Sequence, residues 1–359
     1  MHDFMWHNPT RVIFGRGAEK RIGEELVGAG TYRVLFVHGK RSIYDSGLHN
    51  SILDDLERNN IDCYRTPGVS QNPTLGMAET GIDDAQEFHD VQAILAVGGG
   101  SVIDTAKAIA VGYRDPDIWP FFTGDKKPMR ALPIYCIPTI SGSGSEFNGG
   151  CVLTNEDTAQ KFPLASPLLF PKLTLVNPEL MCTVDRFQTS CGAVDAMVHA
   201  VEATMTAKSG SYAAENFSLA IFNTLCDSCN TLIDNPTDYE ARATMAWASM
   251  MAASGIGIKG LSGYNFPIHM IAHSLSALHG TVHGAAVAVV FLAWCKWRGE
   301  DIDMVWTQRA ELPTSLTELG IPESDIPAIA ANAMGLSRLW KMDDVYTQAV
   351  IEDILRLAV

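Results

Sequence analysis

The segment AILAVGGGSVIDTAKAIA, residues 93–110, indicates the kind of fold that the first half of the chain adopts. An apolar run ends in three glycines and a serine, and a helical pattern follows at once, which predicts a strand, a tight turn and a helix start. Glycine lets the backbone approach a ligand closely, and a helix N-terminus offers free N–H groups to a phosphate. The Rossmann fingerprint G-x-G-x-x-G is incomplete, because its sixth position is Ile103. Taken alone, the loop is weak evidence for a ligand site, since many such loops are only turns.

The surrounding sequence repeats the same alternation. Residues 33–38 (RVLFVH) and 133–137 (PIYCI) are apolar runs closed by Gly, Pro or Ser, and amphipathic stretches lie at 48–59 and 74–89. Strands that alternate with helices at this spacing predict a parallel sheet covered on both faces, as in a Rossmann-like α/β domain. Ligands of such sheets bind at the carboxyl ends of the strands.

A second loop strengthens the interpretation of the first. The predicted strand 133–137 is followed by PTISGSGSE, residues 138–146. Two strand-end loops rich in glycine and hydroxyl groups fit a dinucleotide phosphate site in an acidic protein. The alternative is a pair of surface turns, and together the loops favour the phosphate site.

The second half of the chain is rich in Ala, Met and Leu at helical spacing, with few β-branched runs. It predicts helices over residues 185–205, 211–230, 238–254 and 268–278. We therefore expect two domains. Residues 1–180 form an α/β dinucleotide-binding domain, and residues 181–359 form an all-α, metal-binding and catalytic domain.

Composition excludes several classes of partner. The formal net charge of the 359 residues is −15, and an acidic surface repels nucleic-acid phosphates and anionic lipid. The longest apolar tract, residues 285–295, is shorter than the roughly 18 residues of a membrane span. Eight scattered cysteines do not form a disulfide framework, and the N-terminus does not resemble a signal peptide. We expect a cytoplasmic protein that binds neither nucleic acid nor membranes.

Five of the ten histidines lie between residues 199 and 283. Asp195 and His199 are four residues apart, which places them on one face of a helix, among Ala, Val and Met. An unpaired charge is costly to bury there, so the two either hydrogen-bond to each other or bind a divalent cation. Four more histidines form two pairs at the same spacing, His269 with His273 and His279 with His283. Aspartate and histidine ligands suit Zn²⁺ or Fe²⁺.

A geometric condition applies to the most distant pair. His269 and His283 are 14 residues apart, and a straight helix would separate them by roughly 21 Å. Two ligands of one ion lie only about 3 Å from each other. If both bind, the helix must break between them, and Gly280 and Gly284 bracket a suitable place. Spacing alone leaves open which three or four of the six candidates bind a metal.

Together these motifs resemble the iron-containing (group III) alcohol dehydrogenases, and within them the butanol dehydrogenase-like, NADPH-dependent aldehyde reductases. The resemblance covers nearly the whole chain and implies a second domain similar to that of dehydroquinate synthase. The matching segments, in order, are residues 9–18, Asn72-Pro73, residues 98–101, 138–146, 192–195 with His199, and 269–283.

The resemblance implies a role for each residue of the histidine cluster. Asp195, His199, His269 and His283 are the expected ligands of one divalent metal ion, Fe²⁺ or Zn²⁺. His273 is then expected beside the nicotinamide and the substrate. Since imidazole titrates near neutral pH, His273 is the candidate to relay the proton between alkoxide and solvent.

The resemblance also implies a set of cofactor contacts. The glycine loop, Thr139 and Ser143 are expected to hold the pyrophosphate and the adenine end. Lys161 is expected to contact the ribose, and Asn72 is expected to line the cofactor groove. The full set is Gly39, Lys40, Arg41, Ser42, Asn72, Gly98, Gly99, Gly100, Ser101, Asp104, Thr139, Ser143, Val152 and Lys161.

The choice of nucleotide depends on the end of the first predicted strand. NAD-preferring members of the family carry an acid there, whereas here the sequence is His38-Gly39-Lys40-Arg41-Ser42. An acid would repel a 2′-phosphate, and these cations and the hydroxyl can bind one. The alternative is a solvated basic turn. We expect NADP(H), with NAD(H) as the alternative.

The expected reaction is hydride transfer between nicotinamide C4 and the carbonyl or carbinol carbon of a small aldehyde or alcohol, with the metal as Lewis acid. We expect the enzyme to be a homo-oligomer, most simply a dimer. One rival is a metal-dependent lyase or synthase of the same architecture, which would need Lys and Arg around an anionic substrate. The segments that flank the histidines are largely apolar. A second rival is a non-catalytic protein that binds metal or nucleotide.

Overall fold

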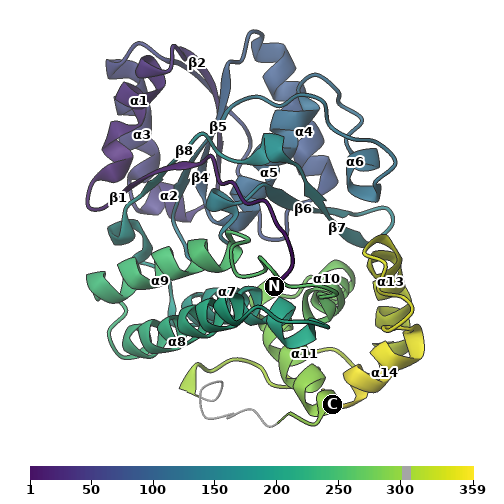
Figure 1. Ribbon diagram of the computed structural model, residues 1–359. Coiled ribbons are helices and arrows are strands. Elements are labelled where there is room, and N and C mark those ends of the chain that lie inside the picture. Colours follow the sequence, from purple (N-terminus) through teal and green to yellow (C-terminus); the bar gives the residue numbers. More distant parts are fainter. Residues whose placement is uncertain (301–308) are drawn as a thin grey trace. The chain divides into compact units, whose positions relative to one another are not determined.

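The computed structural model describes residues 1–300 and 309–359, which form two compact units (Figure 1). Asn8–Asn155 and Pro163–Met181 make up an α/β unit. Met1–His7, Glu156–Phe162 and Cys182–Val359 make up a helical unit. The domain predicted to span 181–359 includes residues 301–308, which lie outside the described residues.

A six-stranded sheet forms the centre of the α/β unit. The strand order is β1-β8-β5-β4-β2-β3, and neighbouring strands pair in parallel. Its central strands are almost entirely buried, as expected for a sheet covered on both faces. The predicted Rossmann-like class is confirmed. The strands are β1 (Arg11–Phe14), β2 (Arg33–His38), β3 (Asp62–Arg65), β4 (Ala93–Gly98), β5 (Ile134–Pro138) and β8 (Leu173–Val176).

Helices cover both faces of this sheet (Figure 1). On one face, apolar side chains of α1 and α3 pack against Val34, Phe36, Leu95 and Val97. On the other face, α5 packs against β4, and α4 packs against α5. The helices are α1 (Ile22–Gly28), α2 (Ser42–Asp45), α3 (Leu48–Arg58), α4 (Leu75–Phe88), α5 (Gly100–Gly112) and α6 (Trp119–Thr123). A separate two-stranded sheet consists of β6 (Gly150–Asn155) and β7 (Gln160–Ala165).

The strand order reverses between β2 and β4. The chain runs from β2 outward to the edge strand β3, and then returns to place β4 on the other side of β2. Such a reversal in a parallel sheet is a topological switch point, and ligands bind at the carboxyl ends of the strands there. These ends are adjacent in register, because His38 pairs with Val97 and Gly98 pairs with Pro138. Both glycine-rich loops therefore leave the sheet side by side, at the carboxyl ends of β4 and β5.

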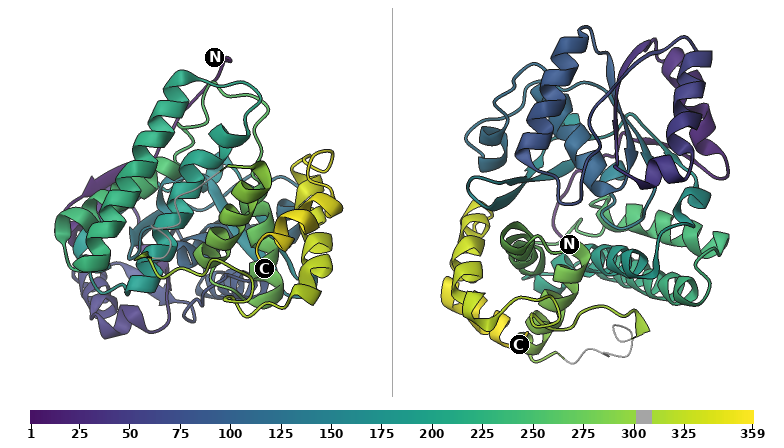
Figure 2. Two further views of the ribbon diagram at one scale, coloured as in Figure 1. Left: turned by 90° about the horizontal axis from the view of Figure 1, so that it is seen from below. Right: turned by 180° about the vertical axis from the view of Figure 1, so that it is seen from behind.

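The helical unit is built around α7. Helix α7 packs against α8, α9 and α11, while α10 packs against α11 and α13 (Figure 2). The helices α7, α8 and α9 each begin one residue after a capping side chain (Asp185, Ser211, Asp238), which accepts a backbone N–H of the first turn. No described helix has the length and apolarity required to cross a membrane. The helices are α7 (Arg186–Thr206), α8 (Tyr212–Asp234), α9 (Tyr239–Ala253), α10 (Pro267–His279), α11 (His283–Arg298), α13 (Ile326–Leu339) and α14 (Gln348–Arg356).

Candidate functional site

One face of α7 supplies three polar side chains to the interior of the helical unit. Asp195, His199 and Glu202 follow one another at intervals of four and three residues, so they lie along one face of the helix. Asp195 and Glu202 are buried among Ala, Val and Met side chains. A buried charge needs a partner, and the partners come from α10 and α11.

The helix ends and a new one begins between His269 and His283, as binding of one metal ion by both would require. Helix α10 ends at His279, Gly280 adopts a left-handed conformation with φ of 66°, and α11 begins at His283. Gly284 lies inside α11 rather than in the break. A Cβ atom at Gly284 would collide with the backbone carbonyl of Cys191 in α7. The two glycines therefore have different roles, since one reverses the chain and the other lets α11 approach α7.

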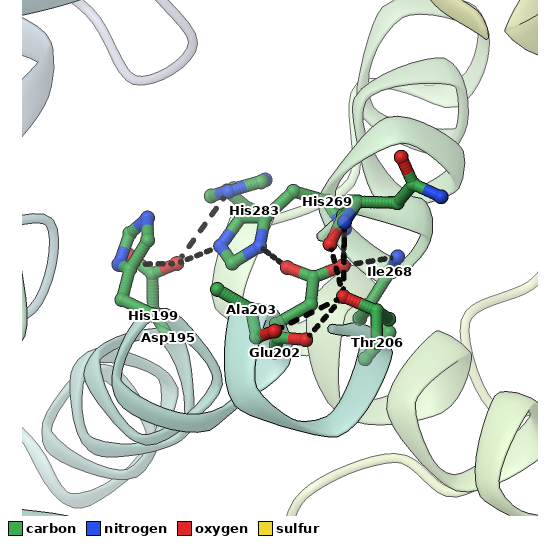
Figure 3. A network of polar contacts seen from close by, with 9 residues as sticks. Asp195, His199, Glu202, Ala203, Thr206, Ile268, His269 and His283 are labelled. Carbon is green, nitrogen blue, oxygen red and sulfur yellow. Dashed lines mark hydrogen bonds and ion pairs between the residues drawn. The ribbon is translucent and has the colours of Figure 1, made fainter. Parts of the chain in front are cut away.

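The reversal brings the predicted ligands together (Figure 3). The Nε2 atoms of His269 and His283 each lie 3.5 Å from Oδ1 of Asp195, and Nδ1 of His199 lies 3.8 Å from the same oxygen. Asp195, His199 and His269 each offer a ligand atom within 4.8 Å of the other two. His283 joins this group through its contact with Asp195.

Four ring or carboxylate atoms at this point are buried without a hydrogen-bond partner among the described residues. They are Asp195 Oδ1, His199 Nδ1, His269 Nε2 and His283 Nδ1, the last being the ring nitrogen opposite the Nε2 that contacts Asp195. An unsatisfied buried polar atom costs about 1–3 kcal/mol, so several at one place call for a shared partner. Three imidazoles and a carboxylate are suitable ligands for a divalent transition metal. The residues present fit such an ion.

The protonation states of Asp195, His199 and His283 suit a cation. Burial favours the neutral acid of Asp195, but His199, His283 and His269 outweigh it and hold the pKa of this carboxyl below its usual value. Burial, together with His269, lowers the pKa of His199 to about 4. Burial and Lys161 lower the pKa of His283 well below its ordinary value. An ionised carboxylate and neutral imidazoles are the forms that bind a metal.

Glu202 orients His269 from behind. Its carboxylate accepts the backbone N–H of Ile268 at 2.5 Å and that of His269 at 3.3 Å, and it also contacts Nδ1 of the His269 ring. Burial disfavours the imidazolium, but Glu202 outweighs it and raises the pKa of His269 to about 10. This pKa keeps His269 protonated on both ring nitrogens, with Nδ1–H donated to Glu202 and Nε2–H facing Asp195. A cation that replaces the Nε2 proton leaves the bond from Nδ1–H to Glu202 in place, an arrangement common around metal-bound histidines. Sequence reasoning missed Glu202, although its position seven residues after Asp195 was a signal.

The other two histidines of the cluster differ from each other. His273 is buried one turn after His269, its Nδ1 lies 3.2 Å from the backbone oxygen of Lys161, and its ring centroid lies 5.2 Å from that of His283. Burial, and after it His283, lowers the pKa of His273 well below its ordinary value. His279 instead lies 3.9 Å from Asp325. Of the two, only His273 is next to the candidate metal centre.

The two glycine-rich loops of the α/β unit contact each other. The N–H of Thr139 donates to the carbonyl of Gly98 at 3.1 Å. A Cβ atom on Gly99 would lie 2.6 Å from Ile140, and one on Gly100 would collide with Ser143. Gly99 and Gly100 thus permit loop-to-loop packing, while the close approach of a ligand to residues 98–100 stays a prediction.

The basic turn after β2 is exposed. Lys40, Arg41 and Ser42 all lie at the surface, and Arg41 Nε donates to the Asp45 carboxylate at 3.0 Å. Asp45, which sequence reasoning did not consider, places one acid beside the two cations. Gly39 pairs with Val69 next to this turn.

The remaining predicted cofactor contacts fall into two groups. Asp104 accepts from the hydroxyl of Ser145 at 2.6 Å and from the N–H of Val152 at 3.1 Å, so these residues belong to the α/β unit beside the second loop. Asn72, in the same unit, adopts a left-handed conformation with φ of 55°. Lys161 is buried in the helical unit, where its backbone oxygen contacts His273.

Comparisons with known proteins agree along the chain. The iron-containing alcohol dehydrogenase family model matches residues 9–178, and the model for the C-terminal part of the Fe-containing alcohol dehydrogenase family matches residues 189–305. The probable NADH-dependent butanol dehydrogenase 1 of Bacillus subtilis is 34% identical over 297 residues, which covers 82% of this chain and 76% of that protein. The NADPH-dependent aldehyde reductase YqhD of Escherichia coli is 28% identical over 380 residues, which covers 96% of this chain and 97% of that protein.

The fold of this chain is also similar to that of a solved structure. The crystal structure of NADH-dependent butanol dehydrogenase A from Thermotoga maritima superimposes with a TM-score of 0.94 at 35% sequence identity. The match covers 100% of this chain and 99% of that one.

Proposed function

The chain belongs to the iron-containing alcohol dehydrogenase family, and we propose that it transfers hydride between a nicotinamide nucleotide and a small alcohol or aldehyde, with Asp195, His199, His269 and His283 as the ligands of one divalent metal ion. The observation that carries the proposal is the group of buried, unpartnered ligand atoms around Asp195. Fe²⁺ and Zn²⁺ both suit this donor set. When bound, such an ion acts as a Lewis acid that polarises a carbonyl oxygen or lowers the pKa of an alcohol.

His273 is the proposed proton relay. Its lowered pKa keeps the imidazole neutral at physiological pH, which is the form that accepts a proton. A proton on Nδ1 can be donated to the backbone oxygen of Lys161, which leaves the Nε2 lone pair for the substrate. In the oxidative direction His273 takes the hydroxyl proton, while the hydride leaves the carbinol carbon for nicotinamide C4. In the reductive direction both steps are reversed.

The switch point between β2 and β4 is the proposed nucleotide site. The supporting features are the two interlocked glycine-rich loops and the adjacent carboxyl ends of these strands. NADP(H) is the preferred nucleotide of this proposal because Lys40, Arg41 and Ser42 follow β2 without an intervening acid. The proximity of Asp45 to Arg41 favours the alternative, NAD(H). The relatives named above include both NADH- and NADPH-dependent enzymes.

The rival functions have less support. The relatives named above are dehydrogenases and a reductase, and the helix that carries His269 and His273 contains no Lys or Arg. A lyase acting on an anionic substrate would need cations there. We also propose a homodimer in a reducing, cytoplasmic setting, and the eight free thiols are consistent with such a compartment. Light scattering and cell fractionation test the dimer and its location.

Turnover with a panel of aldehydes tests the function. Oxidation of NADPH and NADH is followed by absorbance with protein loaded with Zn²⁺ or Fe²⁺. We expect turnover with a small aldehyde, faster with NADPH, and loss of turnover in His269→Ala. Absence of turnover with every aldehyde and both nucleotides, or full activity in His269→Ala, contradicts the proposal.

A further inference from the structure

Lys107 in α5 carries an ammonium group that is completely buried. Its Nζ donates to the backbone oxygens of Ser145, Asn148 and Gly150 at 2.6, 2.8 and 2.7 Å. The side-chain oxygen of Asn148 lies at 3.1 Å and completes a shell of four oxygen atoms. Nothing in the sequence singles out this lysine, which is one polar residue in a largely apolar helix.

The surroundings of this ammonium resemble the site of a monovalent cation. Its three N–H donors match three backbone carbonyls, and none of the four oxygen atoms belongs to a carboxylate. Burial lowers the pKa of Lys107, and the nearby Asp104 opposes this effect. A buried charge held by neutral oxygens is retained only when the geometry satisfies every donor. The arrangement therefore ties one chain segment, residues 145–150, closely to α5.

The segment held in this way continues directly from the second glycine-rich loop. Asp104, one turn before Lys107, accepts from the Ser145 hydroxyl and the Val152 N–H, so two side chains of α5 grip the segment. The first turn of α5 packs against the same loop, because Gly100 adjoins Ser143. Helix α5 thus begins at one predicted phosphate loop and fixes the other.

We propose that Lys107 is a positioning residue of the nucleotide site, whose ammonium acts as a built-in monovalent cation and holds the loop of residues 138–146 in its binding shape. This inference rests on the proposed function, because it is the proposed function that assigns the loop to the cofactor phosphates. A carbonyl oxygen tied to the ammonium is kept away from a bound pyrophosphate, which it would repel. A loop released from Lys107 can turn its carbonyls outward and lose affinity for the nucleotide.

Two variants separate the charge from the space that Lys107 fills. Lys107→Ala leaves an oxygen cage that a free NH₄⁺ or K⁺ ion can enter, whereas Lys107→Met fills a similar volume without a charge. The Kd for NADPH is measured by fluorescence titration in NH₄Cl and in tetramethylammonium chloride of equal ionic strength, since tetramethylammonium is too large for the cage. The Kd for Zn²⁺ is measured in the same samples.

We expect both variants to raise the Kd for NADPH by about tenfold, the loss of one charge-assisted hydrogen-bonding group. NH₄Cl should restore most of the affinity of Lys107→Ala and none of that of Lys107→Met. The Kd for Zn²⁺ should not change, because the metal ligands lie in the other unit. Wild-type nucleotide affinity in both variants, or equal recovery of both in NH₄Cl, overturns the proposal.

Two further measurements keep the inference testable. If the Lys107 variants do not fold, Asn148→Ala still leaves three backbone carbonyls for the three N–H donors, and we expect it to raise the Kd for NADPH by a few-fold; an unchanged Kd overturns the proposal. If the wild type binds neither NADPH nor NADH, the proposed function fails. The Tm of Lys107→Ala then tests by itself whether the four oxygen atoms form a cation site. That part of the proposal is refuted if the Tm in NH₄Cl is no higher than the Tm in tetramethylammonium chloride.

Discussion

Glu202 connects the backbone of one helix to the ring of a proposed ligand. Phe266, at the start of α10, offers no side-chain cap, and the carboxylate of Glu202 accepts the backbone N–H groups of Ile268 and His269 instead. The same carboxylate contacts Nδ1 of His269. A single buried side chain thereby fixes the position of the imidazole and keeps a proton on its Nδ1.

Replacement of Glu202 by glutamine tests this role. In Glu202→Gln the amide oxygen can still accept from the first turn of α10, but the NH₂ group then faces Nδ1 of His269 and forces the ring proton onto Nε2. We expect metal affinity to fall by about 10–100-fold, measured by competition with a chromogenic chelator. Glu240→Gln, an exposed change in α9, is the control and should bind as the wild type does. Unchanged affinity in Glu202→Gln would remove Glu202 from the site.

Lys40 and Arg41 test the nucleotide preference at single residues. In Lys40→Ala with Arg41→Ala the attraction for a 2′-phosphate is lost, and we expect KM for NADPH to rise about tenfold or more while KM for NADH changes little. Steady-state kinetics with a saturating aldehyde measure both constants. An equal change in KM for the two nucleotides would show that these residues form a solvated basic turn and do not bind a 2′-phosphate.

At the scale of elements, the turn between α10 and α11 brings His283 to Asp195. The need for a break followed from the sequence, because 14 helical residues would have kept His269 and His283 far apart. The role of Gly284 did not follow, because its close approach to Cys191 involves a helix about 90 residues earlier in the chain. Spacing along one segment predicts local geometry, and only the fold reveals packing between segments.

The two glycines of this turn give contrasting predictions. Gly280→Ala places a side chain at φ of 66° in open space, so we expect only the backbone strain of about 1–2 kcal/mol in unfolding free energy, with metal affinity retained. Gly284→Ala forces α11 away from α7 and moves His283, so metal affinity should fall sharply. Urea unfolding and a metal titration of each variant measure the two effects. The reverse order of metal affinities would contradict the proposed division of roles.

The second glycine-rich loop shows the same limit of sequence reasoning. Its Gly and Ser content predicted a phosphate loop at a strand end, and the structure places it beside the first loop. The ammonium of Lys107 behind it was not predictable, since its three carbonyl partners lie about 40 residues away and carry no mark in the sequence. The type of a side chain indicates which chemistry it can perform, but it does not indicate which distant backbone groups it will bind.

At the scale of the whole molecule, the proposed functions are divided between two compact units. The glycine-rich loops and the basic turn belong to the α/β unit, while Asp195, His199, His269 and His283 belong to the helical unit. The class of each unit was predictable, because alternating strands and helices differ plainly from a continuous helical pattern. Two short segments, Met1–His7 and Glu156–Phe162, join the helical unit although they precede it in the chain. Contacts between residues distant in sequence place these two segments in the helical unit, and the sequence pattern does not reveal such contacts.

Titration of metal into chelator-treated protein, with aldehyde-dependent NADPH oxidation as the readout, tests whether Asp195 and the three histidines hold a metal ion that turnover requires. We expect no turnover without metal, a rise in rate that ends at one ion per chain, and no rise at any ratio in Asp195→Ala. Full turnover in the chelator-treated protein, or a normal titration of Asp195→Ala, would contradict it.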